Sequence, residues 1–383
     1  MRVAVIDDGV EEHEDLAGRV LQGYTPLNST GYGRPTTQVV SGVTIGHGQA
    51  CAGIIAASHN TLGGAGVAPN VQIVPINIFH TWVYNSYYGR YISTESVQNV
   101  ASAIEYAWNP SKGNADVISN SWGYSAAPTN ADYITQEITN AVNRGRGGKG
   151  CVVVFASGND HPSYGVSFPA SLGTVISVGA VNKNGIVWNY SCRGNGLDVV
   201  APSGNTNLNG DVATTDRMGT NGYETGNYTL RFGGTSAACP QVASVAALIL
   251  SKYPDLTWSE VKYRIVKTAF GLSGYTYHNP TGSPNGSWSN EVGYGLVNAY
   301  AALLPVPYSV NFNLFNYNEQ GLSDFRIEIM SESGLPICNE SKYLNVYDSY
   351  STRVIARQLS DLRMCQRQCL AVLRLYCRKR RTT

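Results

Sequence analysis

Short apolar segments alternate with helical patterns along most of this sequence, and this alternation constrains the fold more than any other feature. Strands separated by helices form parallel sheets whose two faces are covered by those helices. The sequence therefore predicts an α/β fold of three layers, α/β/α, with a mostly parallel central sheet. The predicted strands are 3–6, 72–77, 116–119, 151–156 and 175–181, and the predicted helices are 47–58, 95–107, 130–144, 236–252 and 257–269.

The helical pattern stops near Ala302, and the remaining residues have a different character. Pro-containing and alternating segments follow, which predict β-strands. We therefore expect one large α/β domain over residues 1–303 and a small, partial β-rich appendage over 304–355. Residues 356–383 contain eight Lys or Arg, one Asp and three Cys, and do not continue the strand pattern. We predict a basic tail that is disordered or artefactual, with an amphipathic helix at a membrane surface as the alternative.

Charge and apolar runs exclude several classes of function. A formal net charge of only +1 argues against a general nucleic-acid-binding protein. No apolar run reaches the ~18 residues of a membrane span. The apolar neighbours of Cys51, Cys151 and Cys239 predict buried free thiols rather than a disulfide scaffold. The chain opens at Met1 inside its first predicted strand, without a signal-peptide pattern, so we expect that an N-terminal segment is missing.

Three polar segments interrupt the apolar elements. Asp7-Asp8-Gly9 ends the first strand, Gly46-His47-Gly48 opens the helix that follows, and Gly234-Thr235-Ser236 opens a later helix. In an open parallel sheet, functional groups gather at the carboxyl ends of strands and at helix N-termini. These segments can therefore reach one crevice. A serine hydroxyl needs a base, an imidazole titrates near neutrality, and a carboxylate fixes the tautomer of that imidazole.

Each of these residues also has a structural interpretation. Ser236 alone is typical of a helix N-cap, His47 of a structural histidine, and Asp7 of a loop cap. Their co-occurrence in the order Asp, His, Ser, with small residues around each, favours chemistry. We predict that Ser236 is a nucleophile, that His47 is its base and that Asp7 orients His47.

These segments resemble the motifs of the subtilisin-like serine protease family over about residues 1–303. Gln49 and Ala50 stand where the family usually has Thr and then His or Arg. The resemblance implies a subtilisin-like fold and a serine endopeptidase that hydrolyses peptide bonds through an acyl-enzyme intermediate. It also implies that Asn159 donates to the oxyanion, beside the triad Asp7, His47 and Ser236. The segments that carry the resemblance are 3–10, 47–53, 156–159, 199–202, 234–240 and 293–299.

The resemblance also implies which residues bind substrate. The segment Asp7-Asp8-Gly9 is similar to the aspartate motif of the kexin and furin branch of the family. Proteases of that branch cut after paired basic residues. No acidic residue follows Gly123 closely, so dibasic specificity is not expected, but Asp8 is expected to favour a basic residue one position upstream of the cut. The expected substrate-binding residues are Asp8, Ser121, Trp122, Gly123, Ser157, Gly158 and Thr235.

No cofactor is expected for the chemistry, but the resemblance implies a structural Ca²⁺ site at Asp15 and Asn60, with an ordinary solvated aspartate as the alternative. The implied partners are polypeptide substrates. We expect a monomer that has no membrane span and binds no nucleic acid. Family habit implies secretion or an extracytoplasmic location. The competing hypothesis is a catalytically inactive subtilisin-like binding module, or a truncated fragment that cannot mature without its propeptide.

Overall fold

The computed structural model describes residues 1–36, 45–79, 82–85, 90–93, 95–206, 211–279 and 286–304, together with two strands nearer the C-terminus. The chain divides into two compact units, Met1–Leu304 and Pro305–Thr383, and each is described by itself. In the second unit, β11 (Phe325–Met330) pairs antiparallel with β12 (Val372–Cys377). β12 lies within the segment expected to be a separate tail, so a division at 355 does not describe this pairing.

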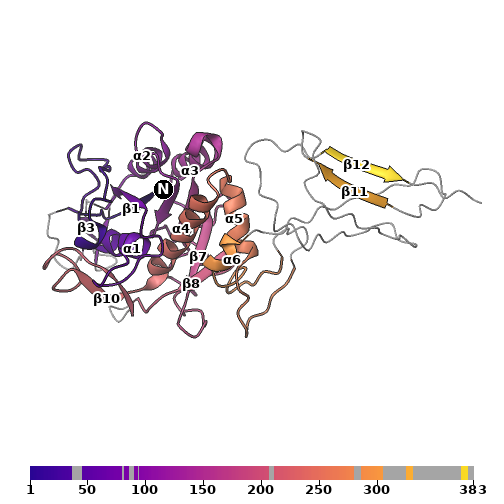
Figure 1. The fold of residues 1–383 in the computed structure, drawn as a ribbon. Coiled ribbons are helices and arrows are strands. Elements are labelled where there is room, and N and C mark those ends of the chain that lie inside the picture. Colours follow the sequence, from indigo (N-terminus) through magenta and orange to yellow (C-terminus); the bar gives the residue numbers. More distant parts are fainter. Residues whose placement is uncertain are drawn as a thin grey trace, which may run out of the picture. The chain divides into compact units, whose positions relative to one another are not determined.

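A sheet of six parallel strands forms the centre of the first unit (Figure 1). Its order is β2-β1-β5-β6-β7-β8, so the chain starts next to the edge strand β2, and the strands from β5 to β8 follow on the other side of β1. The predicted parallel sheet is confirmed, and 199–202 adds a sixth strand that the apolar pattern did not indicate. The strands are β1 (Arg2–Asp7), β2 (Gln72–Asn77), β5 (Val117–Asn120), β6 (Val152–Ala156), β7 (Ile176–Val181) and β8 (Val199–Pro202).

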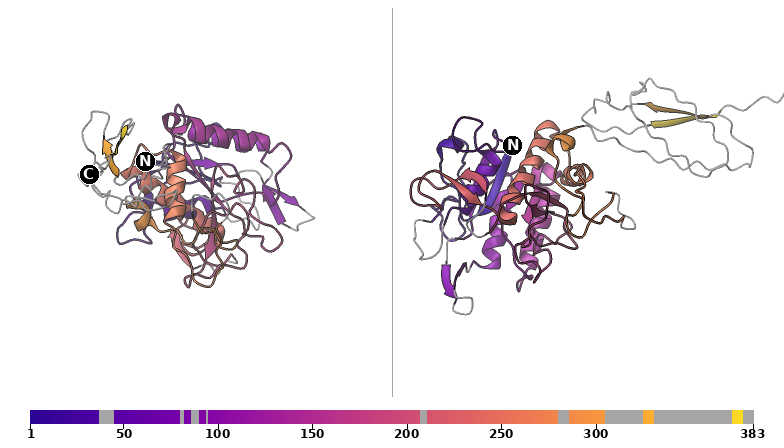
Figure 2. Two further views of the ribbon diagram at one scale, coloured as in Figure 1. Left: turned by 90° about the vertical axis from the view of Figure 1, so that its right-hand side faces the viewer. Right: turned by 90° about the horizontal axis from the view of Figure 1, so that it is seen from below.

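Helices cover both faces of this sheet, which confirms the three-layer α/β/α prediction (Figures 1 and 2). α1 (His47–Ala56) and α4 (Gly234–Lys252) pack on one face, and α2 (Val97–Trp108) and α3 (Asp132–Arg144) pack on the other. α5 (Trp258–Lys267) and α6 (Ala299–Leu303) join the side of α4. The 3-10 helices η1 (Glu14–Leu16) and η2 (Gly145–Gly148) lie in loops.

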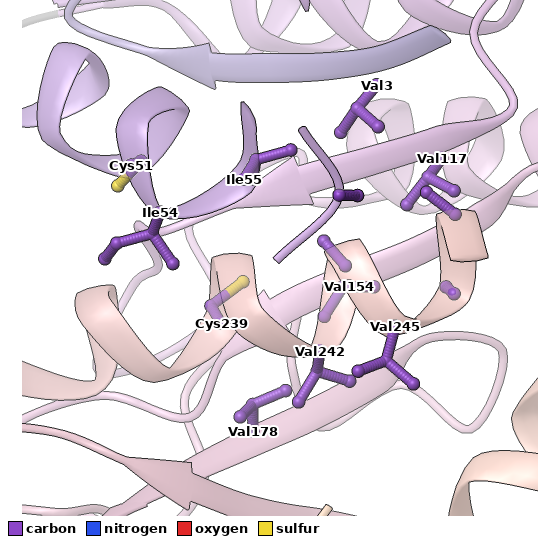
Figure 3. Packing of buried hydrophobic residues seen from close by; sticks show 14 of the residues in the cluster. Val3, Cys51, Ile54, Ile55, Val117, Val154, Val178, Cys239, Val242 and Val245 are labelled. Carbon is purple, nitrogen blue, oxygen red and sulfur yellow. The ribbon is translucent and has the colours of Figure 1, made fainter. Parts of the chain in front are cut away.

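Neighbouring residues of one strand enter opposite cores, which explains why these strands are apolar without alternation. In β6, Val154 packs in the cluster with α1 and α4, whereas Phe155 packs in the cluster with α2 and α3. Figure 3 shows Val154 and Val178 of the sheet in the same cluster as Val242 and Val245 of α4. The sheet is therefore buried on both faces, and its strand ends are held rigidly.

Two antiparallel pairs lie outside the central sheet. β9 (Val212–Thr215) pairs with β10 (Tyr228–Phe232), and β3 (Trp82–Asn85) pairs with β4 (Arg90–Ser93). β10 ends at Phe232, and only Gly233 separates it from α4. The pair therefore borders the segment that carries Ser236.

Two expectations about apolar residues have clear outcomes in the described part of the chain. The predicted buried free thiols are confirmed for Cys51, Cys151 and Cys239, and Cys192 is a fourth. One described helix, α4, is long and apolar enough to cross a membrane by length and composition. Most of α4 is buried in the core, as expected for the central helix of a globular unit.

Candidate active site

Asp7 and His47 form a hydrogen-bonded pair where β1 ends and α1 begins. His47 Nδ1 lies 2.9 Å from Asp7 Oδ1 and 3.0 Å from Asp7 Oδ2. The carboxylate is 1% exposed, whereas the imidazole is 29% exposed. A buried carboxylate therefore holds the proton on Nδ1, which leaves Nε2 as the basic nitrogen of the ring.

The charge of Asp7 sets the basicity of His47. Burial lowers the pKa of His47, but the Asp7 carboxylate, with smaller contributions from Cys51 and Tyr223, raises it, and the resulting pKa is well above the ordinary 6.5. The pair can therefore accept a proton and stabilise the imidazolium that results.

Ser236 lies in the first turn of α4, and a proline one turn later shapes its surroundings. The helix begins at Gly234, two residues earlier than predicted, so Pro240 lies beyond the first turn. Proline has no N–H, so it removes the helical hydrogen bond to the carbonyl four residues before it, which is that of Ser236. The Ser121 hydroxyl donates to this carbonyl instead, at 3.0 Å, and the Ser236 hydroxyl donates back to the Ser121 carbonyl at 3.3 Å.

Cys51 links the histidine helix to the serine helix. Its Sγ lies 3.9 Å from both Asp7 Oδ2 and His47 Nδ1, and 3.7 Å from the carbonyl oxygen of Ser236. Figure 3 shows Cys51 on α1 above α4. One ligand atom each from Asp7, His47 and Cys51 lies within 4.8 Å of the others, close enough to share a metal ion, but that ion would compete with the Asp7–His47 hydrogen bond.

Asn159 follows β6, and its amide has one defined orientation. Its Oδ1 accepts hydrogen bonds from the backbone N–H and from the hydroxyl of Thr235, each at 2.9 Å. The Nδ2 atom therefore remains as a donor. Gly234 has a φ of +73°, and a Cβ there would lie 3.2 Å from Asn159 Nδ2, so glycine suits both the backbone and the close approach.

The expected substrate-binding residues lie in different surroundings. Trp122 packs its ring edge-on against Phe155, with centroids 5.2 Å apart. Ser157 is fully buried, and its hydroxyl donates to the Cys192 carbonyl. The side chains of Trp122 and Ser157 therefore support the core around the site.

Gly123 and Gly158 face a residue that sequence reasoning missed. A Cβ on Gly123 would lie 2.7 Å from Ser167 Oγ, and a Cβ on Gly158 would lie 3.3 Å from Ser167 Cβ. Ser167 is buried, and its hydroxyl has no hydrogen-bond partner in the described part of the chain. No motif marks this serine, because only the approach of two loops distant in sequence brings it between the glycines.

Asp8 differs from its expected role. Its side chain is 4% exposed, and its carboxylate accepts three backbone hydrogen bonds from the start of α1, where a substrate-facing carboxylate was expected. Burial and the neighbouring Asp7 raise the pKa of Asp8 to about 6, although His47 and the amides of Gly46 and Gly48 lower it. Asp8 is therefore an internal group of the site.

The two residues expected to bind calcium are neighbours. Asp15 is fully buried, and its Oδ2 has no hydrogen-bond partner among the described residues. Its Oδ1 accepts from Asn60 Nδ2 at 2.7 Å, while Asn60 Oδ1 accepts from Leu62 N at 2.7 Å. An unpaired buried carboxylate oxygen fits a hard cation. Asn60 presents its nitrogen to Asp15, so it fits as a ligand only if its amide turns over.

A parallel α/β/α sheet with a buried Asp–His pair beside a helix-borne serine is typical of serine proteases of the subtilisin type. A family comparison agrees with this class. Residues 1–295 match the model of the subtilase family. The chain belongs to the subtilase family, a family of serine proteases, and its fold is the subtilisin-like α/β fold.

Individual relatives show the same relationship. The chain is 34% identical over 330 residues to a calcium-dependent protease of Trichormus variabilis, covering 79% of this chain and 46% of that protein. It is 32% identical over 306 residues to subtilisin DY of Bacillus licheniformis, covering 79% and 90% of the two chains. Fervidolysin from Fervidobacterium pennivorans, a keratinolytic enzyme related to subtilisin, superposes with a TM-score of 0.58 at 27% identity, covering 88% of this chain and 48% of its own. The chain thus spans about half the length of some relatives.

Proposed function

We propose that this protein is a serine endopeptidase in which Ser236, His47 and Asp7 form the catalytic triad. Ser236 Oγ attacks the scissile carbonyl carbon while His47 Nε2 takes the hydroxyl proton. The C–N bond then breaks, and the leaving amine receives that proton from His47. A water molecule, deprotonated in turn by His47, hydrolyses the acyl-enzyme and restores the Ser236 hydroxyl.

Two donors serve the oxyanion in this proposal. The backbone N–H of Ser236 and the Nδ2 of Asn159 would bind the oxygen that becomes negatively charged when the tetrahedral intermediate forms. Thr235 supports this role because it occupies Asn159 Oδ1 with two hydrogen bonds and so leaves Nδ2 to donate. Fixed donors of this kind are effective because they need no reorientation as the charge develops.

The proposal depends on the Asp7–His47 pair, which shares Cys51 as a neighbour with the turn that carries Ser236. The imidazole must lie in the correct tautomer next to the nucleophile, and the buried Asp7 carboxylate provides that tautomer. Cys51 contacts both the imidazole and the Ser236 carbonyl, so the base and the nucleophile-bearing turn share one neighbour. In this structure the Ser236 hydroxyl donates to Ser121, so catalysis requires it to rotate toward His47.

Polypeptides are the proposed substrates. A cavity of about 560 Å³ is lined in part by Thr206, which lies near Gly234 at the start of α4. Trp188 and Tyr190 stack on one another and form part of its wall. This part of the lining suits an apolar or aromatic side chain of the substrate, and Asn182, Asn189 and Asn205 add polar groups around it. Activity outside the cytoplasm is the location that the family relationship favours.

A structural Ca²⁺ bound at Asp15 is part of the same proposal. The ion would pair with the free Oδ2 of Asp15, with loop carbonyls and, after its amide turns over, with Asn60. It would stabilise the loop that follows α1 and take no part in the chemistry.

The experiment compares cleavage of a denatured protein substrate by the wild-type chain, by Ser236→Ala and by Ser244→Ala. Ser244 lies on the same helix, is buried and donates to the Pro240 carbonyl, so its variant is a matched control. The proposal predicts internal cleavage by the wild type and by Ser244→Ala, and none by Ser236→Ala. A folded wild-type chain that cuts nothing would favour the inactive binding module instead.

A further inference from the structure

The loop after β1 is interlocked with the first turn of α1. Asp8 Oδ2 accepts hydrogen bonds from the N–H groups of Gly46 (2.8 Å) and His47 (3.0 Å), and Asp8 Oδ1 accepts from Gly48 (2.7 Å). In return, the Gln49 side chain accepts from the backbone N–H of Glu11 at 2.9 Å. Two short segments about forty residues apart therefore hold each other at four points.

These contacts replace an ordinary helix cap. The first N–H groups of a helix have no partner within it, and a polar side chain just before the helix usually supplies one. Here that position is Gly46, which has no side chain to offer. The cap comes instead from Asp8, the residue that directly follows β1 and Asp7.

We infer that Asp8 is a positioning residue that fixes His47 relative to Asp7. This inference rests on the proposed function. The Asp8 backbone N–H also donates to Asp7 Oδ1 at 2.8 Å, so Asp8 orients the Asp7 carboxylate with its main chain and holds the His47 backbone with its side chain. Both partners of the Asp7–His47 hydrogen bond are thereby tied to one residue.

Fold stability alone does not explain an aspartate at this position. Asp8 is buried and lies next to a second buried carboxylate, Asp7, and both effects disfavour its charged form. The titratable groups around it are Asp7 on β1, His47 on α1 and the Tyr223 phenol from the loop that packs on α1. The fully buried Asp216 carboxylate and the Arg217 side chain of that loop both lie near Gly46. The charge is compatible with this site because it accepts three N–H groups at a helix N-terminus.

Acid should weaken this arrangement. Since the pKa of Asp8 is about 6, a fall in pH below that value adds a proton to a carboxylate surrounded by N–H donors. The added proton occupies a lone pair on a carboxylate oxygen of Asp8, so that lone pair can no longer accept an N–H group. It also removes the negative charge near His47. His47 takes up its proton at a higher pH, because its pKa lies well above 6.5, so activity should already fall there. The proton on Asp8 should add a second loss below pH ~6.

The test compares Asp8→Ala, Asp8→Asn and Asp8→Ser with a control, Asp198→Asn. Asp198 is a buried carboxylate away from α1 that accepts from Ser177 N and pairs with Lys262 at 2.9 Å, so its variant removes a buried charge without touching α1. We expect Asp8→Ala to lower kcat about tenfold with little change in KM, because only the alignment of the base is lost. Asp8→Asn should move the acid limb of the pH profile to lower pH and make it less steep. Asp8→Ser keeps an oxygen acceptor for the N–H groups and should recover part of kcat.

A second readout does not require activity. The proton on His47 Nδ1, donated to Asp7, should give a far-downfield ¹H NMR signal in the wild type and in Asp198→Asn, and this signal should weaken or vanish in Asp8→Ala. Wild-type kcat, pH profile and downfield signal in Asp8→Ala would overturn the inference. A rise in KM confined to substrates with a basic residue upstream of the cut would overturn it as well, and would assign Asp8 to the substrate. A wild-type chain without activity would refute the proposed function, while the downfield signal would still test the role of Asp8.

Discussion

Ser121 and Ser236 exchange two hydrogen bonds, each hydroxyl donating to the main-chain carbonyl of the other residue. The exchange depends on Pro240, which cannot donate to the Ser236 carbonyl and so leaves it for Ser121. A residue after strand β5 thereby fixes the turn that carries the proposed nucleophile.

Ser121→Ala tests this relationship. The Ser236 carbonyl would keep only the weak thiol contact from Cys51, and a buried polar group without a good partner typically costs about 1–3 kcal/mol. We expect a lower free energy of unfolding, by a value in that range, together with a reduced kcat. Chemical denaturation and steady-state kinetics measure the two effects. Wild-type values for both would show that the Ser121 hydroxyl does not hold the turn.

Asn159→Ala tests the oxyanion donor. Removing one such donor lowers kcat by about 10²–10³-fold in serine proteases, because the hydrogen bond is strongest in the transition state. We expect that loss with KM nearly unchanged. Thr235→Val keeps the backbone donor to Asn159 but removes the hydroxyl, so we expect a smaller loss of about tenfold. A large rise in KM at constant kcat in Asn159→Ala would contradict the assignment.

The pH profile should report the Asp7–His47 pair. Because Asp7 holds the pKa of His47 well above 6.5, activity should rise as the pH increases through this raised value and the imidazole loses its proton. The stability from the charged pair has the opposite trend: it is fully present below pH ~6.5 and is lost as the pH rises through the raised pKa. Asp7→Asn should move the acid limb to lower pH and reduce kcat by about 10⁴-fold. An acid limb that does not move in Asp7→Asn would exclude His47 as the titrating base.

Calcium should stabilise the protein without entering the chemistry. Adding a chelator should lower the melting temperature, because a ligand that binds only the folded state stabilises that state. In Asp15→Asn the chelator should have little effect on the melting temperature. Differential scanning calorimetry of both proteins with and without Ca²⁺ provides the comparison. Identical melting temperatures of the wild type in both conditions would show that the Asp15 site binds no calcium.

Much of the fold could be predicted from the sequence. Strands buried on both faces leave continuous apolar runs, and short polar segments mark the points where β1 ends and where α1 and α4 begin. The positions of Asp7 and His47 follow from that pattern, since a parallel sheet brings these points to one edge. β9 and β10 were missed because they are short and alternate little between apolar and polar residues.

The surroundings of the site were harder to predict, because they depend on contacts between distant segments. Asp8 was expected to face substrate, but its carboxylate accepts hydrogen bonds from N–H groups at the start of α1, about forty residues away. Ser167 has no motif and is found only from its contacts with Gly123 and Gly158. Asn60 is next to Asp15 as expected, but the direction of its amide follows from a hydrogen bond to Leu62.

Labelling with a fluorophosphonate probe tests the central claim most directly, because only an activated serine reacts. The purified chain and its Ser236→Ala variant are treated with the probe, and the modified residue is mapped by mass spectrometry. We predict a single label on Ser236 in the wild type and none in the variant. A wild-type chain that unfolds in a cooperative thermal transition yet takes up no label would contradict the proposed function.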